Sequence, residues 1–170
     1  MTTNNPPAKQ ANGPDKVFDF TEQMKSGDAG ERLFTKAYSN ICPVKSSDLR
    51  FDFSTNIGTV ELKTDLYPMS QTKNFFMERY GDMNTKKSGG PWRSHEDKVD
   101  FFVYFYTSDL TFFWFKTPEL MKIIDGLTNK RRERWIKNKA WTTLGYVIPR
   151  DELLSVTYQT DIFPAPTDPF

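Results

Sequence analysis

Residues 99–106, VDFFVYFY, constrain the fold of this chain more than any other segment. Their nearly continuous apolar character is typical of a strand that is buried on both faces of a sheet. The apolar run TFFWFK at 111–116 follows after the short connection TSDL, which predicts an antiparallel hairpin. A strand buried on both faces needs other elements packed on each side. We therefore expect a central sheet flanked by helices.

Two helices and several further strands are predicted around this hairpin. Apolar residues at helical spacing predict a helix over 28–40, with Ser26 or Asp28 as its N-cap and Pro43 as its end. Thr117 and Pro118 are typical of a helix start, with Thr117 as N-cap, and predict a second helix over 119–139 that bends or breaks near glycine 126. Further strands are predicted at 48–53, 59–65, 73–79, 141–149 and 155–163. This order indicates an α/β protein with a central mixed β-sheet.

The length of 170 residues fits a single domain. Residues 1–16 are polar and proline-bearing and predict a disordered tail, 17–163 form the domain, and 164–170 form a flexible C-terminal tail. Neither a signal peptide nor a membrane-spanning segment is apparent, so we expect a soluble cytoplasmic protein.

Several kinds of catalytic site are disfavoured by composition. Cys42 is the only cysteine and His95 the only histidine, which argues against cysteine- or histidine-rich metal sites, and we expect structural roles for both. The sequence has no GxSxG elbow, no GxxxxGK[ST] loop and no GxGxxG, so we expect neither a serine hydrolase nor a nucleotide cofactor. Carboxylates and lysines are left to carry any catalysis.

Such groups converge in the predicted hairpin of 48–53 and 59–65. Glu61 and Lys63 lie two residues apart in GTVELKTD and therefore share a strand face, and Gly58 allows the preceding turn. Asp52 lies near the turn on the adjoining strand. Two carboxylates suit Mg²⁺ or Mn²⁺, which can lower the pKa of a water and offset charge on a phosphodiester. Lys63 is suited to orient that water.

Asp52 followed by Glu61-Leu62-Lys63, with Glu31 in GDAGERLF on a preceding helix, resembles the PD-(D/E)XK nuclease superfamily. This superfamily includes many restriction enzymes and the archaeal-type Holliday junction resolvases. The resemblance covers about residues 26–115 and implies a restriction-endonuclease-like core. It implies metal ligation by Asp52 and Glu61, with Glu31 as an auxiliary ligand and Lys63 at the water. It further implies DNA cleavage, possible action in recombination at branched DNA, and a homodimer. Small nucleases of this kind are common in phage.

Other interpretations of these residues stay open. Asp48 competes with Asp52 as first ligand, although Asp52 lies nearer the turn. An ExK pair on a strand is most often a solvated ion pair, and the helix dipole alone favours Glu31 in a first turn. Residues further along the chain could support the site or serve ordinary structural roles: Glu78, Lys98, Asp100, His95 and Trp92.

The strongest local charge run is NKRRERWIKNK, with a second basic stretch, TKKSGG, in a long loop. Such segments can neutralise phosphates, although a solvated helix face is the alternative. The residues predicted to bind nucleic acid are Lys86, Lys87, Arg131, Arg132, Arg134 and Lys137. No base-reading motif accompanies them, so we expect recognition of backbone or structure, with DNA favoured and RNA not excluded.

The sequence thus predicts an Mg²⁺-dependent endonuclease. One alternative is a non-catalytic nucleic-acid-binding protein on the same fold. Another is an unrelated α+β interaction domain that meets a protein partner through an aromatic surface around Phe112–Phe115.

Overall fold

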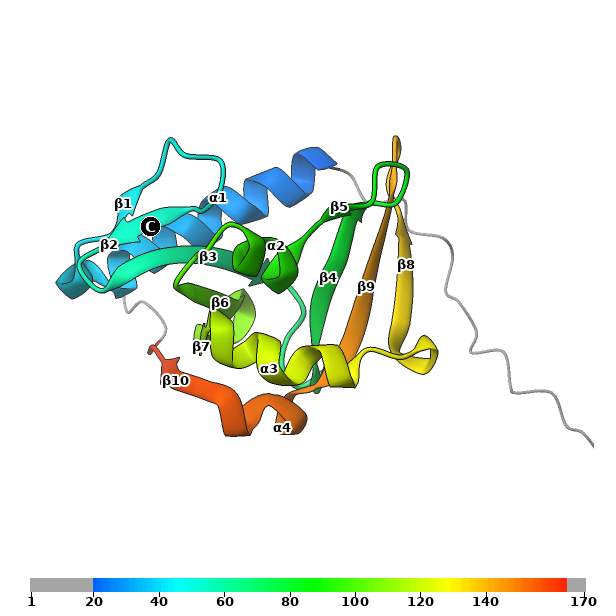
Figure 1. Cartoon of the computed structure of the whole chain (residues 1–170). Helices are drawn as coiled ribbons and strands as arrows, with labels where there is room; N and C mark the ends of the chain where they lie inside the picture. Colours follow the sequence, from blue (N-terminus) through cyan, green and yellow to red (C-terminus); the bar gives the residue numbers. More distant parts are fainter. Residues whose placement is uncertain (1–19, 165–170) are drawn as a thin grey trace, which may run out of the picture.

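The structure, a computed structural model, describes residues 20–164, with side chains from residue 27 onwards. The predicted N-terminal tail and nearly all of the predicted C-terminal tail lie outside the described residues. Within the described range the chain is an α/β protein with four α-helices, a six-stranded mixed sheet and a four-stranded antiparallel sheet (Figure 1). No helix in this range is long and apolar enough to cross a membrane.

The helices and strands are bounded as follows. The helices are α1 (Phe20–Ala37), α2 (Gly90–Glu96), α3 (Thr117–Leu127) and α4 (Arg150–Leu153). The six-stranded sheet has the order β1 (Val44–Lys45), β2 (Phe53–Thr55), β3 (Gly58–Asp65), β6 (Phe101–Tyr106), β7 (Thr111–Lys116) and β10 (Thr157–Ile162). The four-stranded sheet has the order β5 (Lys87–Ser88), β4 (Asn74–Asp82), β9 (Thr142–Pro149) and β8 (Glu133–Lys137).

The six-stranded sheet is built around β6, whose six residues are all buried, as the sequence predicts. β6 pairs with β7 in the predicted antiparallel hairpin and with β3 in parallel. β3 in turn forms a hairpin with β2, which begins only at Phe53 and not at residue 48 as predicted. Gly58 takes a φ of +141° at the start of β3, and a Cβ there would lie 2.8 Å from the Asp100 carboxylate, so the turn requires glycine.

Helix α1 covers one face of this sheet. Phe34 and Tyr38 from α1 pack with Phe53, Val60 and Trp114 in one aromatic cluster. The helix approaches β3 closely at Gly30, where a Cβ would lie 2.4 Å from the Thr64 hydroxyl oxygen. This close contact fixes the place of Glu31, the next residue of the helix, relative to the hairpin.

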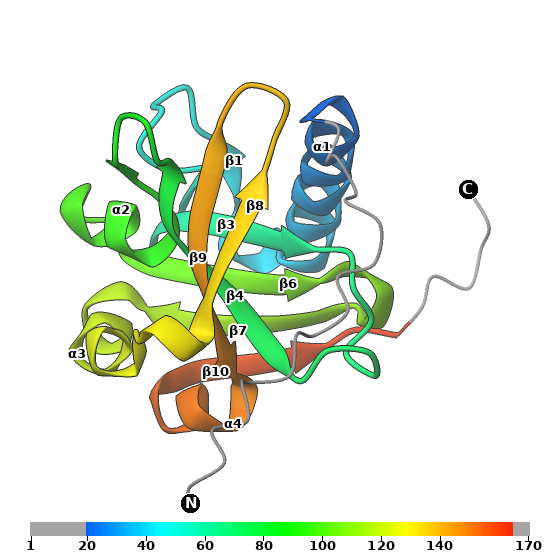
Figure 2. The ribbon, with the colours of Figure 1, turned by 90° about the vertical axis from the view of Figure 1, so that its right-hand side faces the viewer.

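The four-stranded sheet covers the other face, together with α2 and α3. Figure 2 shows β4, β9 and β8 running across β3, β6 and β7. Phe75 and Met77 of β4 and Ile148 of β9 share a core cluster with Tyr104 of β6 and Phe115 of β7. β3 therefore lies between α1 on one side and α2 with the second sheet on the other. Its alternate side chains, Glu61 and Lys63, point away from the Val60 face that α1 covers.

Several sequence predictions of local structure are wrong. Helix α1 starts at Phe20, so Ser26 and Asp28 lie inside it rather than at its cap. The predicted strand at 48–53 is mostly a loop with Leu49 exposed, because the Asp48 side chain bonds locally and competes with strand pairing. The N-cap of α3 is Lys116 and not Thr117.

The predicted long helix over 119–139 ends at Leu127. Lys130–Arg132 is a 3₁₀ turn and Glu133–Lys137 is strand β8, which pairs with β9. Tertiary pairing here overrides the helical propensity of a Lys- and Arg-rich segment. The alternative of an exposed aromatic surface around Phe112–Phe115 is also wrong, since all four residues are buried between the layers.

Candidate active site

The β2–β3 hairpin brings Asp52 and Glu61 together. The Asp52 N–H donates to the Val60 carbonyl at 3.0 Å, which extends the hairpin by one residue beyond β2. The Asp52 carboxylate accepts the Leu62 N–H at 2.8 Å, so it lies beside the backbone that carries Glu61. Both acidic side chains are half-buried. The structure therefore places the two predicted carboxylates next to one another.

Ionisation of both carboxylates is unfavourable in this setting. Burial first, and the nearby Asp52 charge second, raise the pKa of Glu61 from 4.5 to about 8. Burial also raises the pKa of Asp52, against the hydrogen bond from Leu62. A bound cation favours ionised carboxylates, so this pair has a physical reason to accept one.

Glu31 lies close enough to Asp52 for its charge to raise the Asp52 pKa. Its own carboxylate, however, forms an ion pair with Lys45 of β1. Helix α1 thus delivers Glu31 to the edge of the site, as the resemblance implies, but holds it on a lysine. Its auxiliary metal-binding role stays a prediction.

Lys63 completes the predicted set. It follows Glu61 on the same face of β3, is half-buried, and its charge lowers the Glu61 pKa. No hydrogen bond fixes its ammonium group among those that the structure gives, so the group is suited to meet a water or a substrate.

The donor chemistry of the pair fits Mg²⁺ or Mn²⁺. These ions are commonly held by one or two carboxylates, with waters and substrate phosphates as the other ligands. Among residues 27–164 no group of three or more Asp, Glu, His or Cys converges as a metal centre. Asp52 and Glu61 therefore suit a site that a substrate completes and do not suit an all-protein cage.

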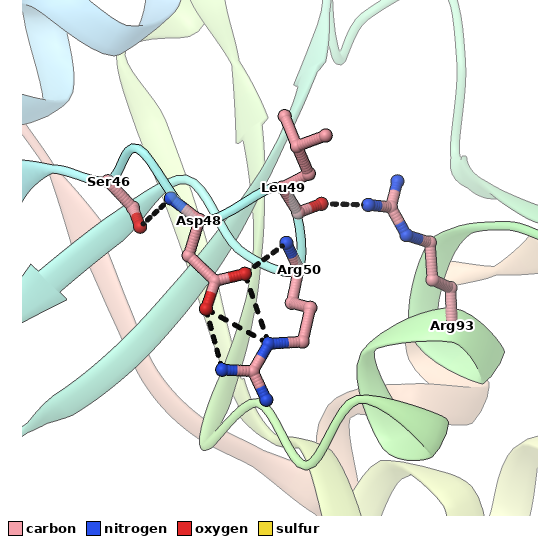
Figure 3. A network of polar contacts seen from close by, with 5 residues as sticks. All are labelled: Ser46, Asp48, Leu49, Arg50 and Arg93. Carbon is pink, nitrogen blue, oxygen red and sulfur yellow. Dashed lines mark hydrogen bonds and ion pairs between the residues drawn. The ribbon is translucent and has the colours of Figure 1, made fainter.

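Asp48, the competing first ligand, is engaged elsewhere. Figure 3 shows its carboxylate held by the Arg50 guanidinium at 2.6 Å and by the Arg50 N–H at 3.0 Å. This pairing lowers the pKa of Asp48. Because Asp48 is held by Arg50, while the charge of Asp52 raises the pKa of Glu61, the structure favours Asp52 as the partner of Glu61.

Arg93 is a site residue that the sequence analysis missed. It lies on α2 and donates to the Leu49 carbonyl (Figure 3). It also pairs with Asp97 at 3.5 Å. Its charge lowers the pKa of both Asp52 and Glu61. Lys63 and Arg93 therefore both place positive charge near the pair, while Asp97, the partner of Arg93, raises the pKa of Glu61. Only the packing of α2 over the hairpin brings Arg93 there, and no local motif signals it.

The other candidates have structural partners. Asp100 accepts the Thr59 N–H at 2.8 Å and the Thr59 hydroxyl at 2.9 Å, which ties β6 to the start of β3. Trp92 is buried and donates to Asp125 at 2.8 Å. The Glu78 carboxylate lies against Gly89, just before α2. His95 and Lys98 are exposed and line a separate pocket, described below.

The predicted nucleic-acid-binding residues are not on one helix face. Lys86 and Lys87 lie at the β5 edge of the four-stranded sheet, and Arg134 and Lys137 lie on β8 at the opposite edge. Figure 1 shows β5 and β8 on either side of β4 and β9. These four basic residues are exposed, as is Arg131. Arg132 instead forms a bidentate pair with Glu152, at 2.7 and 2.9 Å, and is only half exposed. The basic residues thus lie on two separate edges.

Comparisons with protein-family models, with curated proteins and with solved structures find no match for this chain.

Proposed function

We propose that this protein is an Mg²⁺- or Mn²⁺-dependent endonuclease that hydrolyses phosphodiester bonds of DNA. The observation that carries the proposal is the half-buried Asp52–Glu61 pair, in which burial raises both pKa values and Lys63 shares the face of Glu61. Paired carboxylates with raised pKa values beside a lysine are more typical of a functional site than of a solvated ion pair.

The arrangement of elements also supports a restriction-endonuclease-like core of the PD-(D/E)XK type. Helix α1 precedes the β2–β3 hairpin, β3 pairs in parallel with β6, and the acidic residues sit on the hairpin. In the PD-(D/E)XK superfamily, which the sequence resembles, a helix likewise precedes a hairpin that carries the acidic residues.

The carboxylate pair and its two neighbouring cations have different roles in the proposed chemistry. Asp52 and Glu61 would hold the divalent cation, which would supply a water of lowered pKa and positive charge near the phosphate. Lys63 orients the attacking water and offsets charge that develops on the phosphate. Arg93 keeps both carboxylates closer to their ionised, metal-binding form.

The resemblance to junction resolvases favours branched DNA as the substrate and a homodimer as the active form. A symmetric dimer can present two sites to the two strands of a junction. The exposed basic residues at both edges of the four-stranded sheet offer charge to phosphates without base-reading elements.

A panel of labelled substrates tests this proposal. Four-way junctions, linear duplexes and RNA are incubated with the protein in Mg²⁺ and in EDTA. We expect Mg²⁺-dependent cuts near the branch point of the junction. Equal cutting of linear DNA or of RNA would keep the nuclease but reject the junction preference. Salt-dependent binding in EDTA without cleavage of any substrate in Mg²⁺ would favour the non-catalytic alternative.

A further inference from the structure

A pocket of about 480 Å³ lies at the beginning of β6 and of α3, apart from the carboxylate pair. Its polar lining comes from the end of α2 and the start of α3, and its apolar lining includes Ile57, Phe101 and Pro118. Its volume falls within the range of about 300–1,000 Å³ that is typical of small-ligand sites.

Thr117, one of the lining residues, has a side-chain hydroxyl without a partner. Thr117 is 1% exposed, and among the described residues its Oγ1 is the one buried side-chain polar atom that makes no hydrogen bond. A buried hydroxyl left unpaired is costly, so such an atom usually has a ligand or water to meet. Thr117 is also the first residue of α3, an eleven-residue helix that no side chain caps.

The charged groups around Thr117 favour an anion. His95, Lys98 and Lys116 line the pocket and are exposed, so their donors can reach a ligand. The Lys116 ammonium also lies 4.8 Å from the centre of the Tyr158 ring. Two carboxylates line the pocket as well, but both are engaged: Asp100 by Thr59, and Glu119 by Lys122 at 2.9 Å.

We propose that this pocket binds a phosphate group. The Thr117 hydroxyl donates to a phosphate oxygen, and Lys98, Lys116 and His95 contact the phosphate from the rim. The Thr117 N–H takes no part, because it donates to the Asp100 carbonyl at 3.0 Å. The apolar side of the pocket, at Ile57 and Phe101, suits the sugar or base of a nucleotide attached to that phosphate.

The pocket also has a fixed relation to the carboxylate pair. Asp100, at its edge, is bonded to Thr59, and Glu61 lies two residues further along β3. Two residues of a strand span about 7 Å, a separation on the order of one or two nucleotides of one DNA strand. A strand cut at Glu61 can therefore place a nearby phosphate in the pocket. This last step rests on the proposed function, whereas phosphate binding itself does not.

The test uses His95 as a reporter. It is the only histidine in the chain, so its ring signals in an NMR spectrum need no assignment. The full-length protein is titrated in EDTA with inorganic phosphate, with a 5′-phosphorylated oligonucleotide and with the same oligonucleotide lacking that phosphate. We expect saturable shifts of the His95 ring signals with inorganic phosphate and tighter binding of the oligonucleotides. A difference between the two oligonucleotides would assign the pocket to a terminal phosphate, and equal shifts would assign it to a backbone phosphate.

Two variants make the result specific. Lys98→Gln is expected to weaken phosphate binding by about tenfold or more, while Lys73→Gln, a charge change outside the pocket, leaves it unchanged. Thr117→Val removes the unpaired hydroxyl, so it is expected to raise Tm while weakening phosphate binding. Thr143→Val is its control: Thr143 is also buried but donates to the Gly81 carbonyl at 3.0 Å, so the change lowers Tm and leaves binding intact.

The absence of saturable His95 shifts with every probe would overturn the phosphate site. Shifts that persist equally in Lys98→Gln and Thr117→Val would do the same. Because the titration contains EDTA and measures no cleavage, either outcome leaves the nuclease proposal untouched. Failure of cleavage in the substrate panel likewise leaves phosphate binding intact.

Discussion

Replacing Glu61 with glutamine should stabilise the metal-free protein at neutral pH. The folded protein raises the pKa of Glu61 from 4.5 to about 8, so it binds this proton more tightly than the unfolded chain does. Stability from this group is therefore fully present below pH 4.5 and is lost as the pH rises towards 8. The cause is burial first and the Asp52 charge second.

The size of the effect follows from the same values. At pH 7, which is about 2.5 pH units above the ordinary pKa, Glu61 is ionised in the unfolded chain and takes up a proton on folding. This proton uptake lowers the free energy of unfolding by about 3 kcal/mol. Glutamine has nearly the shape of protonated glutamate, but its side chain does not titrate. The free energy of unfolding of Glu61→Gln in EDTA should thus exceed that of the wild type by about 3 kcal/mol at pH 7 and by almost nothing at pH 4.5.

Urea unfolding of both proteins at several pH values between 4.5 and 8 measures this difference. Asp151→Asn, at an exposed carboxylate, is the matched control and should show no such trend. Saturating Mg²⁺ should then stabilise the wild type and leave Glu61→Gln unchanged, because a ligand that binds only the folded state adds stability. A Glu61→Gln variant that is less stable than the wild type at pH 7, or a difference that is independent of pH, would refute the reasoning.

Two further predictions concern the residues that position the pair. Gly30→Val should push α1 away from Thr64, lower the free energy of unfolding by about 1–3 kcal/mol and reduce cleavage. Gly27→Ala is the control: a Cβ there meets nothing within 4 Å, so the change should stabilise the same helix by up to about 1 kcal/mol. Equal unfolding midpoints for both variants would contradict the close contact at Gly30. Arg93→Met should raise the pKa of Glu61, so the acidic limb of the Mg²⁺-dependent pH–rate profile should move to higher pH, and an unmoved limb would remove Arg93 from the site.

The sequence predicts the shared face of Glu61 and Lys63, and the turn before them, because the determinants of both are local. The period of two places Glu61 and Lys63 on one face of a strand, and Gly58 permits the turn before them. The buried run of β6 similarly needs no tertiary information, because apolar residues on both faces already require covering layers.

The remaining features depend on contacts between distant segments. Arg93 reaches the carboxylates only because α2 packs over the hairpin, 41 residues from Asp52 in sequence. Residues 133–137 have the composition of a helix but gain more by pairing with β9, which removes the basic helix face that the sequence predicts. No feature of the sequence separates the strands of the second sheet from those of the first. The second sheet is built from β4, β5, β8 and β9.

The most direct test of the account is the initial rate of Mg²⁺-dependent cleavage on one labelled four-way junction. Wild type, Glu61→Gln and Lys63→Met are compared at matched DNA binding, with Asp151→Asn as the control. We predict cleavage by the wild type and by Asp151→Asn, with losses of at least about a hundredfold in the other two. Undiminished cleavage by Glu61→Gln and Lys63→Met would contradict the assignment of this hairpin as the active site.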